Sequence, residues 1–391
     1  MFGNTVRRIL RFAIVGQIAC ASAALAAEPL KIGVILPFTG PYAIYGTKIL
    51  NGAKLYLSQH GGRIGDREVE LVTADDTGVA PELSKRLAQQ LLIKDKVSFL
   101  VGFGLTPSAL TVAPLATQAK VPMIVMNAST TGLTRKSPFI IRVSQTQPQV
   151  TEPMAKWAIE NGVRKVYTLV ADYSPGHDSE KQFTETFTKA GGEIVGSVRY
   201  PLNNADPSPY LEKIKDANPQ AVFVFLPPGE LSIAFIKGFK SRGLEAAGMK
   251  LFGTSLTEEA VIDATGDAAI GVITASNYSE PHRSPENDAY VAAYRKAYGE
   301  DRPNYMSVAG YDGIALIARV AETKGTVVTG QAFMDAVKGI SWASPRGPVQ
   351  IDPETRDIVQ SVYIRKTEKV DGRLENVEFA TYPGVRDPQD R

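Results

Sequence analysis

The chain has 391 residues, with 43 basic against 41 acidic residues, 44% hydrophobic residues and one cysteine. This length is enough for two or three domains with ample cores, and the ordinary apolar and charged fractions exclude a disordered chain, a collagen and a polytopic membrane protein. A single cysteine excludes a disulfide framework and a cysteine zinc cluster, and a net charge of +2 gives no electrostatic reason to expect nucleic acid as a partner.

The first 27 residues have the pattern of a secretory signal. Three arginines lie within the first 11 residues, and the 16 residues from Phe12 to Ala27 carry no charge. The segment is short for a membrane span, and Ala24-Leu25-Ala26 fits the small-residue cleavage pattern. Cys20 raises the alternative of a lipoprotein, which Gln17 disfavours, and an uncleaved anchor is the third alternative. Cleavage after residue 26 leaves 365 residues with 40 basic and 41 acidic side chains, and we expect this cysteine-free protein in the periplasm.

From Pro29 onward, short runs rich in β-branched residues alternate with amphipathic stretches. Ile49, Ala53 and Tyr56 recur at helical spacing, and so do the leucines of 83–91. Alternation of this kind predicts a parallel sheet with helices on both faces. The predicted strands of this half are 30–38, 68–75, 97–104 and 121–128.

The same alternation starts again after residues 139–144. Residues 284–340 have a mainly helical pattern, and residues 347–351 precede a β-hairpin that turns at Asp371-Gly372. We therefore predict two α/β lobes, late helices and a β-rich tail. The predicted strands of the second half are 165–173, 193–200, 221–226, 250–255 and 271–278.

Motifs for catalysis, metals and cofactors are missing from the sequence. The three histidines are far apart with no metal-binding spacing, no G-x-S-x-G elbow occurs, and signal cleavage removes the only thiol. The segment 243–250 resembles a phosphate-binding loop, but Met249 occupies the position of its lysine. The segment 102–107 begins like a dinucleotide fingerprint and lacks the third glycine. We expect no enzyme, no metal and no cofactor, although an unrecognised pair of carboxylates stays open.

The predicted strand ends carry small hydroxyl residues. The strand at 97–104 leads into Thr106, Pro107 and Ser108, and the apolar run 121–126 leads into the polar segment 127–132. Ligands of open parallel sheets bind beyond the carboxyl ends of the strands, where helix N-termini offer free N–H groups. Two such loops suit a carboxylate or another polar group. The alternative is ordinary helix capping by serine and threonine, which looks the same in sequence.

An ordered series of motifs resembles the type I periplasmic binding proteins, and within them the branched-chain amino-acid (Leu/Ile/Val) family of ABC importers. The segment 31–41 followed by Tyr45-Gly46 is similar to the opening of these proteins. The similarity extends over essentially the whole mature chain. Further matches are Asn51-Gly52-Ala53, Asp75-Asp76 with Pro81, Val101-Gly102, Val121-Pro122 and Tyr311-Asp312-Gly313.

This resemblance implies an α/β fold of two Rossmann-like lobes, joined by three crossovers, with one ligand in the cleft between them. Lobe 1 would contain 28–145 and 279–346. Lobe 2 would contain 146–278 and 347–391. The crossovers near 144–148, 277–281 and 346–349 would be the hinges, and we expect a monomer.

The resemblance also implies contact residues in lobe 1. Tyr45 falls at the family's cleft tyrosine, and Thr106 falls at its first hydroxyl contact to the ligand carboxylate. Ala128 and Thr130 fall at the next pair, which contacts the carboxylate and the ammonium. The same lobe 1 wall should include Phe103, Leu105 and Ser129.

Lobe 2 departs from the family pattern. The family's aromatic contact precedes a glycine, where this chain has Pro175 and, two residues earlier, Tyr173; a second tyrosine position holds Pro228. The acidic residue that pairs with the amino acid's ammonium aligns with Ser255. A short slip of the alignment would bring Glu258 or Glu259 to that position instead.

An ammonium group without a carboxylate partner in a dry cleft loses several kcal/mol of binding energy, on the order of two decades in affinity. We therefore predict a ligand with an acid group and no amine, such as an aromatic or 2-oxo acid, which hinge closure captures for delivery to an ABC permease. An amino acid, an amide or urea stays open as the ligand. A sensory module with the same cleft and a secreted α/β enzyme are the alternative functions.

Overall fold

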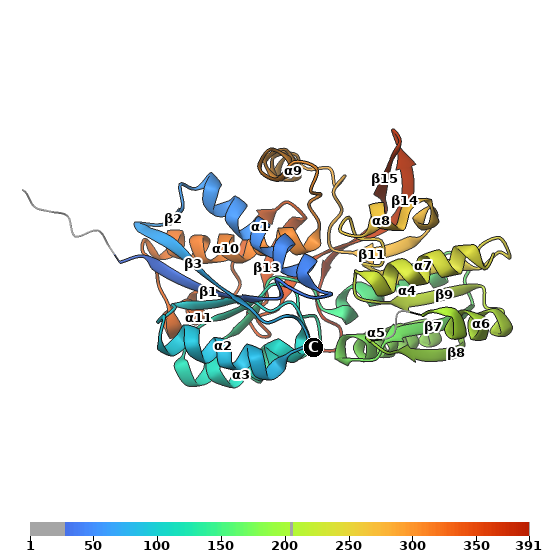
Figure 1. The fold of residues 1–391 in the computed structure, drawn as a ribbon, viewed down its shortest axis with the longest axis horizontal. Helices are drawn as coiled ribbons and strands as arrows, with labels where there is room; N and C mark the ends of the chain where they lie inside the picture. The colour runs from blue at the N-terminus through green and yellow to red at the C-terminus, as the bar shows by residue number, and fades with distance from the viewer. Residues whose placement is uncertain (1–27, 204–205, 391) are drawn as a thin grey trace, which may run out of the picture.

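The computed structural model describes residues 28–203 and 206–390, so the predicted signal segment lies outside the described residues. The strands form two sheets in an elongated molecule of two lobes (Figure 1). The C-terminal end of the chain lies between the two lobes (Figure 1). Within the described residues, no helix combines the length and apolar character needed to cross a bilayer, and no group of acidic, histidine and cysteine side chains is arranged to hold a metal ion.

The sheet of lobe 1 has six strands in the order β2-β3-β1-β4-β5-β6. All neighbours pair in parallel except β2, which forms a short antiparallel pair with β3. This order places the carboxyl ends of β1, β4 and β5 side by side. The strands are β1 (Leu30–Leu36), β2 (Arg63–Ile64), β3 (Arg67–Asp75), β4 (Phe99–Gly102), β5 (Met123–Val125) and β6 (Ile140–Arg142).

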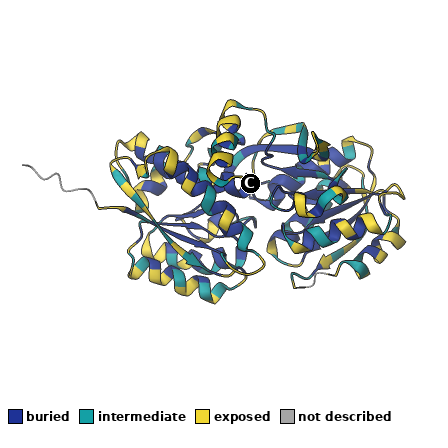
Figure 2. Ribbon diagram, turned by 45° about the horizontal axis from the view of Figure 1, so that its top comes forward, coloured by how far each residue is buried: buried dark blue, intermediate teal, exposed yellow. Residues whose placement is uncertain are grey.

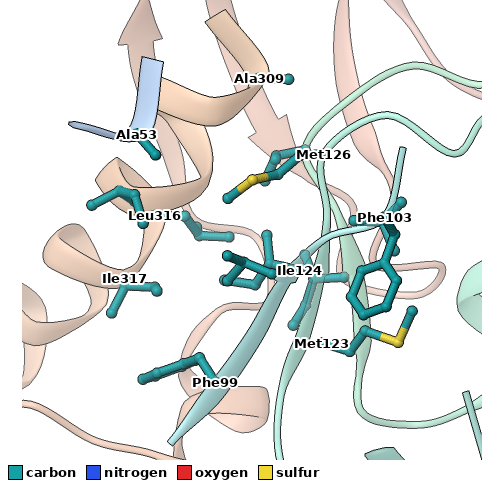
Figure 3. Packing of buried hydrophobic residues seen from close by; sticks show 14 of the residues in the cluster. Ala53, Phe99, Phe103, Met123, Ile124, Met126, Ala309, Leu316 and Ile317 are labelled. Atoms are coloured by element: carbon teal, nitrogen blue, oxygen red, sulfur yellow. The ribbon is translucent and has the colours of Figure 1, made fainter. Parts of the chain in front are cut away.

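Helices cover both faces of this sheet, as the sequence pattern predicts. The helices α2 (Pro81–Ile93) and α3 (Thr106–Ala119) lie on one face, and α1 (Ala43–Gln59) and α10 (Tyr305–Lys324) lie on the other (Figure 1). Phe99, Ile124 and Leu316 are fully buried between them (Figure 3). The remaining helical elements are η1 (Leu133–Lys136), α9 (Pro285–Tyr298) and α11 (Gly330–Ala336).

The late helix α10 packs closely on α1 because small residues face each other. A Cβ atom added at Gly52 would lie 1.8 Å from the carbonyl oxygen of Ser307, and one added at Gly310 would lie 2.0 Å from that of Ile49. Only glycine permits this approach of the two backbones. Residues more than 250 positions apart therefore share one core, so the chain must return to lobe 1 after lobe 2 is built.

The second sheet has nine strands in the order β12-β13-β14-β11-β10-β9-β7-β8, with β15 paired to β14. Most of it forms lobe 2, but its β12–β13 end packs on the lobe 1 core, where Trp342, Val349 and Ile351 are buried. Alternate residues of β9 belong to different cores, since Phe223 packs on one face and Val222 and Val224 on the other. Both faces are thus covered, which accounts for the uninterrupted apolar runs in the sequence. The strands are β7 (Lys165–Ala171), β8 (Glu193–Tyr200), β9 (Ala221–Phe225), β10 (Lys250–Thr254), β11 (Ile273–Ser276), β12 (Ser341–Ser344), β13 (Gly347–Ile351), β14 (Ile358–Val370) and β15 (Arg373–Val385).

Exposed residues concentrate on the outer sides of the helices, and buried residues follow the sheets and the junction between the lobes (Figure 2). Most predicted strands agree with the observed ones to within about three residues at each end, and the hairpin turns at Asp371-Gly372 as predicted. The helices of lobe 2 are α4 (Gln147–Glu160), α5 (Ser174–Lys189), α6 (Ser208–Ala217), α7 (Glu230–Ser241), α8 (Ile262–Thr265) and η2 (Gly266–Ala269).

Candidate ligand-binding site

A cavity lies between the two lobes, at the carboxyl ends of their strands. None of the lining side chains carries a charge. Lobe 1 contributes Tyr45, Gly104, Leu105, Thr106, Asn127, Ala128, Ser129 and Tyr305; the crossover contributes Gln145 and Gln147; lobe 2 contributes Tyr173, Pro175, Phe225, Pro227 and Pro228.

A tight turn after β4 brings backbone to the cavity. Gly102 and Phe103 both have positive φ, at 109° and 63°, and a Cβ atom on Gly102 would lie 2.5 Å from the carbonyl oxygen of Ile35. The left-handed conformation is strained for phenylalanine, and strain of this kind concentrates at functional sites. The turn directs Leu105 and the start of α3 toward the cleft.

Thr106 is the first residue of α3, and its side chain lies in the cavity wall. The residue is 1% exposed, and its hydroxyl oxygen has no hydrogen-bond partner in the protein. The N-cap residue Leu105 provides no side-chain cap, so ordinary capping does not account for this helix end. A buried hydroxyl beside an uncapped helix N-terminus is well suited to an anionic group.

The loop after β5 forms the neighbouring part of the wall. The amide N–H of Ala128 donates to the carbonyl oxygen of Phe103 at 2.9 Å, and Asn127 Nδ2 donates to the carbonyl oxygen of Gly104 at 2.6 Å. Arg142 supports the same loop from below, because its Nη1 donates to the carbonyl oxygens of Ala128 and Thr130. The two loops that the sequence singled out are therefore held together as one surface.

Aromatic rings enclose the cavity from both lobes. Tyr45 and Tyr305 come from lobe 1, while Tyr173 and Phe225 come from lobe 2 and stack at a centroid distance of 6.1 Å and an interplanar angle of 16°. Burial raises the pKa of Tyr45, Tyr173 and Tyr305, so their hydroxyl groups stay neutral. Flat apolar walls and a few fixed polar groups favour a planar ligand with one acidic end.

Two glutamines of the crossover between the lobes complete the site. Gln147 Nε2 donates to Ser129 Oγ of lobe 1 at 3.3 Å, and its Oε1 accepts a hydrogen bond from Thr254 Oγ1 of lobe 2 at 3.0 Å. Gln145 Nε2 donates to Ser255 Oγ at 3.2 Å. These residues connect the cavity wall to the segment where the lobes are joined.

Seven of the ten predicted contact residues line the cavity, and three do not. The Phe103 ring is fully buried in the lobe 1 core (Figure 3), although its carbonyl group fixes the next loop. The Thr130 hydroxyl donates to Asp178 of lobe 2. Ser255 lies behind Gln145, with a φ of 51°. The seven are Tyr45, Leu105, Thr106, Ala128, Ser129, Tyr173 and Pro228.

The acidic residues near the aligned ammonium position both have partners. Glu258 Oε1 accepts a hydrogen bond from Arg365 Nη2 at 2.6 Å, and both side chains are fully buried. Burial raises the pKa of Glu258 to about 7, against the opposing effect of Arg365. Glu259 Oε1 accepts a hydrogen bond from Asn376 Nδ2 at 3.0 Å. Neither carboxylate belongs to the cavity wall.

Several lining residues were missed from the sequence. Gln145 and Gln147 lie in a segment without an apolar period, and Tyr305 starts a helix 176 positions after Ser129, the preceding wall residue from lobe 1. Phe225 lies near the end of a predicted strand and Pro227 follows that strand directly, so the rule that ligands bind at strand ends would have selected them.

Comparison with known proteins gives a consistent result. The family model described as periplasmic binding protein matches residues 29–372. The Leu/Ile/Val-binding protein homolog 6 of Brucella melitensis is 42% identical over 94% of this chain and 95% of its own length.

Two solved structures are similar over nearly the whole chain. A solute-binding protein of an ABC transporter from Rhodopseudomonas palustris BisB5, in complex with 3,4-dihydroxybenzoic acid, is 47% identical with a TM-score of 0.89 and covers 93% of this chain and 99% of its own. A solute-binding protein from R. palustris, in complex with 4-hydroxybenzoate, is 42% identical with the same TM-score and the same coverage.

Proposed function

The chain belongs to the periplasmic binding protein family and is an ABC-transporter solute-binding protein rather than an enzyme, and we propose that its ligand is an aromatic carboxylate of the hydroxybenzoate class. The observation that carries this proposal is the Thr106 hydroxyl, which is buried without a partner at the uncapped start of α3. A carboxylate accepts hydrogen bonds from this hydroxyl and from the free N–H groups of the helix.

The absence of a free acid in the cavity wall argues against an amino-acid ligand. The charge of Glu258 is compensated by Arg365, and the lining residues include no carboxylate that would pair with an ammonium group. The cost of a buried unpaired charge then selects against leucine and valine. The two solved relatives bind acids of the class that we propose, at 42–47% identity.

The aromatic walls supply the rest of the selectivity. A benzoate ring presents two flat faces, and the cavity offers Tyr45 and Tyr305 on one side and the stacked pair Tyr173 and Phe225 on the other. Binding in the micromolar range corresponds to about −8 kcal/mol, which a buried ring and charge-assisted hydrogen bonds are able to provide.

Capture by hinge closure follows from a cavity built by both lobes. A ligand that contacts both walls stabilises the arrangement in which they lie together. We propose hinges near 144–148, 277–281 and 346–349, with lobe 1 containing 28–145 and 279–346. We further propose a monomer that acts in the periplasm after removal of residues 1–26 and delivers its ligand to an inner-membrane permease. N-terminal sequencing of the exported protein and co-purification with the permease test these two points.

A thermal-shift panel tests the ligand class. We expect 4-hydroxybenzoate, 3,4-dihydroxybenzoate or benzoate to raise the melting temperature, because a ligand that binds only the folded state stabilises it by mass action. Leucine and valine serve as controls from the branched-chain class. A shift with leucine or valine and none with the aromatic acids would refute the proposal.

A further inference from the structure

Gln145 lines the cavity from the segment that joins the two lobes. It lies between the end of β6 at Arg142 and the start of α4 at Gln147, on the segment that joins the lobes, and it is 2% exposed. Its side chain lines the cavity from the crossover and bonds to lobe 2. Movement of the lobes therefore acts directly on its position.

A short chain of hydrogen bonds orients the Gln145 amide. Ser255 Oγ lies 3.4 Å from Ser276 Oγ, to which it donates, and 3.2 Å from Gln145 Nε2. The Ser255 hydroxyl uses its proton in the hydrogen bond to Ser276, so its oxygen can only accept from Gln145. The Gln145 atom that faces Ser255 must therefore be the donor, which is Nε2. The Gln145 Oε1 atom then points away from Ser255. This oxygen is buried and has no partner in the protein.

A buried carbonyl oxygen without a donor is unfavourable unless a ligand supplies the hydrogen bond. A carboxylate cannot do so, since it has no proton to donate, and an unsubstituted ring offers only C–H groups. A phenolic hydroxyl is a suitable donor. The cavity thus presents a donor at Thr106 and an oriented acceptor at Gln145.

Asn127 offers a second unpartnered oxygen, but it belongs to the carboxylate side of the wall. Its Nδ2 donates to the carbonyl oxygen of Gly104, which is two residues before Thr106. Gln145 is bonded to lobe 2 instead. Gln145 therefore reaches the cavity without a hydrogen bond to the loop that would hold the acid group.

We infer that Gln145 Oε1 accepts a hydrogen bond from a ring hydroxyl of the ligand, and so makes the cavity prefer hydroxylated benzoates over benzoate. The inference rests on the proposed function and extends it to the substitution on the ring. Ser255 is then a positioning residue, which acts by orienting the glutamine amide.

Calorimetry on four proteins tests this inference with benzoate and 4-hydroxybenzoate. We expect the wild type to bind 4-hydroxybenzoate about tenfold more tightly than benzoate, as one neutral hydrogen bond in a buried site implies. Gln145→Met, which keeps the length of the side chain and removes the acceptor, should reduce this ratio to near one. Ser255→Ala should reduce the ratio by a smaller factor, because the freed amide is no longer held in one orientation.

Gln147→Met is the matched control, since both polar atoms of Gln147 already have protein partners. It should weaken both ligands by the same factor and leave their ratio unchanged. Circular dichroism melts verify that each variant is folded. If Gln145→Met still bound 4-hydroxybenzoate about tenfold more tightly than benzoate, the inference would be overturned and the proposed function would stand. A wild type that binds neither acid would refute the proposed function, and the inference with it.

Discussion

Glu280 accepts a hydrogen bond from Arg302 Nε at 2.7 Å, with both side chains almost completely buried at the junction of the lobes. Arg295 and Arg373 approach the same carboxylate at 2.7 and 3.2 Å. Arg302 also donates to the carbonyl oxygen of Leu374, so this group connects helices of lobe 1 to a strand of lobe 2. The crossover at 277–281 is thereby fixed by charge as well as by packing.

Replacing this carboxylate should destabilise the protein in a pH-dependent way. Burial alone would raise the pKa of Glu280, but Arg302 and the hydrogen bonds from Arg295 outweigh it and lower the pKa below 4.5. An acid whose pKa is lowered on folding contributes stability above its unfolded pKa, and that contribution disappears as the pH falls through the folded value. We expect Glu280→Gln to lower the free energy of unfolding by about 3 kcal/mol at pH 7, as for a broken buried ion pair.

Urea titrations at several pH values measure this effect. The difference between wild type and Glu280→Gln should shrink as the pH is lowered from 5 toward 3. The exposed pair of Lys181 and Glu185 supplies a matched control, because Glu185→Gln removes an ion pair on the surface and should change stability by less than about 1 kcal/mol. A difference that is independent of pH would contradict the ionic role of Glu280.

Removal of the Thr106 hydroxyl should weaken acidic ligands specifically. Thr106→Ala deletes a donor to the carboxylate, and a hydrogen bond to a charged group contributes about 1.5–3 kcal/mol. Calorimetry with 4-hydroxybenzoate should therefore show roughly a tenfold or greater loss, while 4-hydroxybenzyl alcohol should lose much less. Thr106→Ser retains the hydroxyl and should remain close to the wild type. If Thr106→Ala weakened the binding of the acid and the alcohol equally, Thr106 would not be the contact to the ligand carboxylate.

Tyr173 should select for a flat ring. It stacks on Phe225, and aromatic contacts contribute about 0.5–1.5 kcal/mol beyond the area they bury. We expect Tyr173→Leu to weaken benzoate by about three- to tenfold and cyclohexanecarboxylate by less, measured by calorimetry. Tyr173→Phe separates the ring from its hydroxyl and should keep the preference. The stacking role would be wrong if both acids lost affinity equally in Tyr173→Leu.

The fold was readable because strands and helices repeat local patterns over most of the chain. The strand at Glu193–Tyr200 agrees with its predicted bounds, and the strand at Ala221–Phe225 ends one residue before its predicted end. Such runs carry their own periodicity and their own turn residues. The helical interpretation of 284–340 was also correct, although the sequence alone did not reveal that α10 packs on α1 through Gly52 and Gly310.

The cavity was only partly predictable because its walls come from distant segments. Thr106 and Ser129 follow predicted strands, so the rule for strand ends selects them. Gln145 and Tyr305 become wall residues only when the two lobes are folded against each other. No local sequence pattern predicts how the two lobes pack against each other. Ser255 shows the opposite case, since alignment placed it at the ligand and the structure places it behind Gln145.

The hydrogen bond between Thr130 and Asp178 raises the question whether the lobe 1 loop binds the ligand or holds the two lobes together. The resemblance to the amino-acid binders assigns Thr130 to the ligand, whereas in this structure its hydroxyl donates to Asp178 on α5, which also accepts the amide N–H of Thr131 at 3.0 Å. A contact between the lobes forms only when they lie together, so its loss should weaken every ligand by the same factor. Thr130→Ala and Asp178→Ala should each reduce affinity by about two- to tenfold for 4-hydroxybenzoate and 4-hydroxybenzyl alcohol alike.

A double-mutant cycle measured by calorimetry distinguishes these roles, because residues that act through one contact are not additive. If the interlobe contact is the role of Thr130, the double variant should bind no more weakly than either single variant. Thr117→Ala, on the outer part of α3, is the control and should leave affinity near the wild-type value. If Thr130→Ala instead weakened only 4-hydroxybenzoate, and Asp178→Ala changed the affinity for neither ligand, Thr130 would be a contact to the ligand carboxylate. In that case the loop recognises the ligand directly, and closure depends on Gln147 and its partners Ser129 and Thr254.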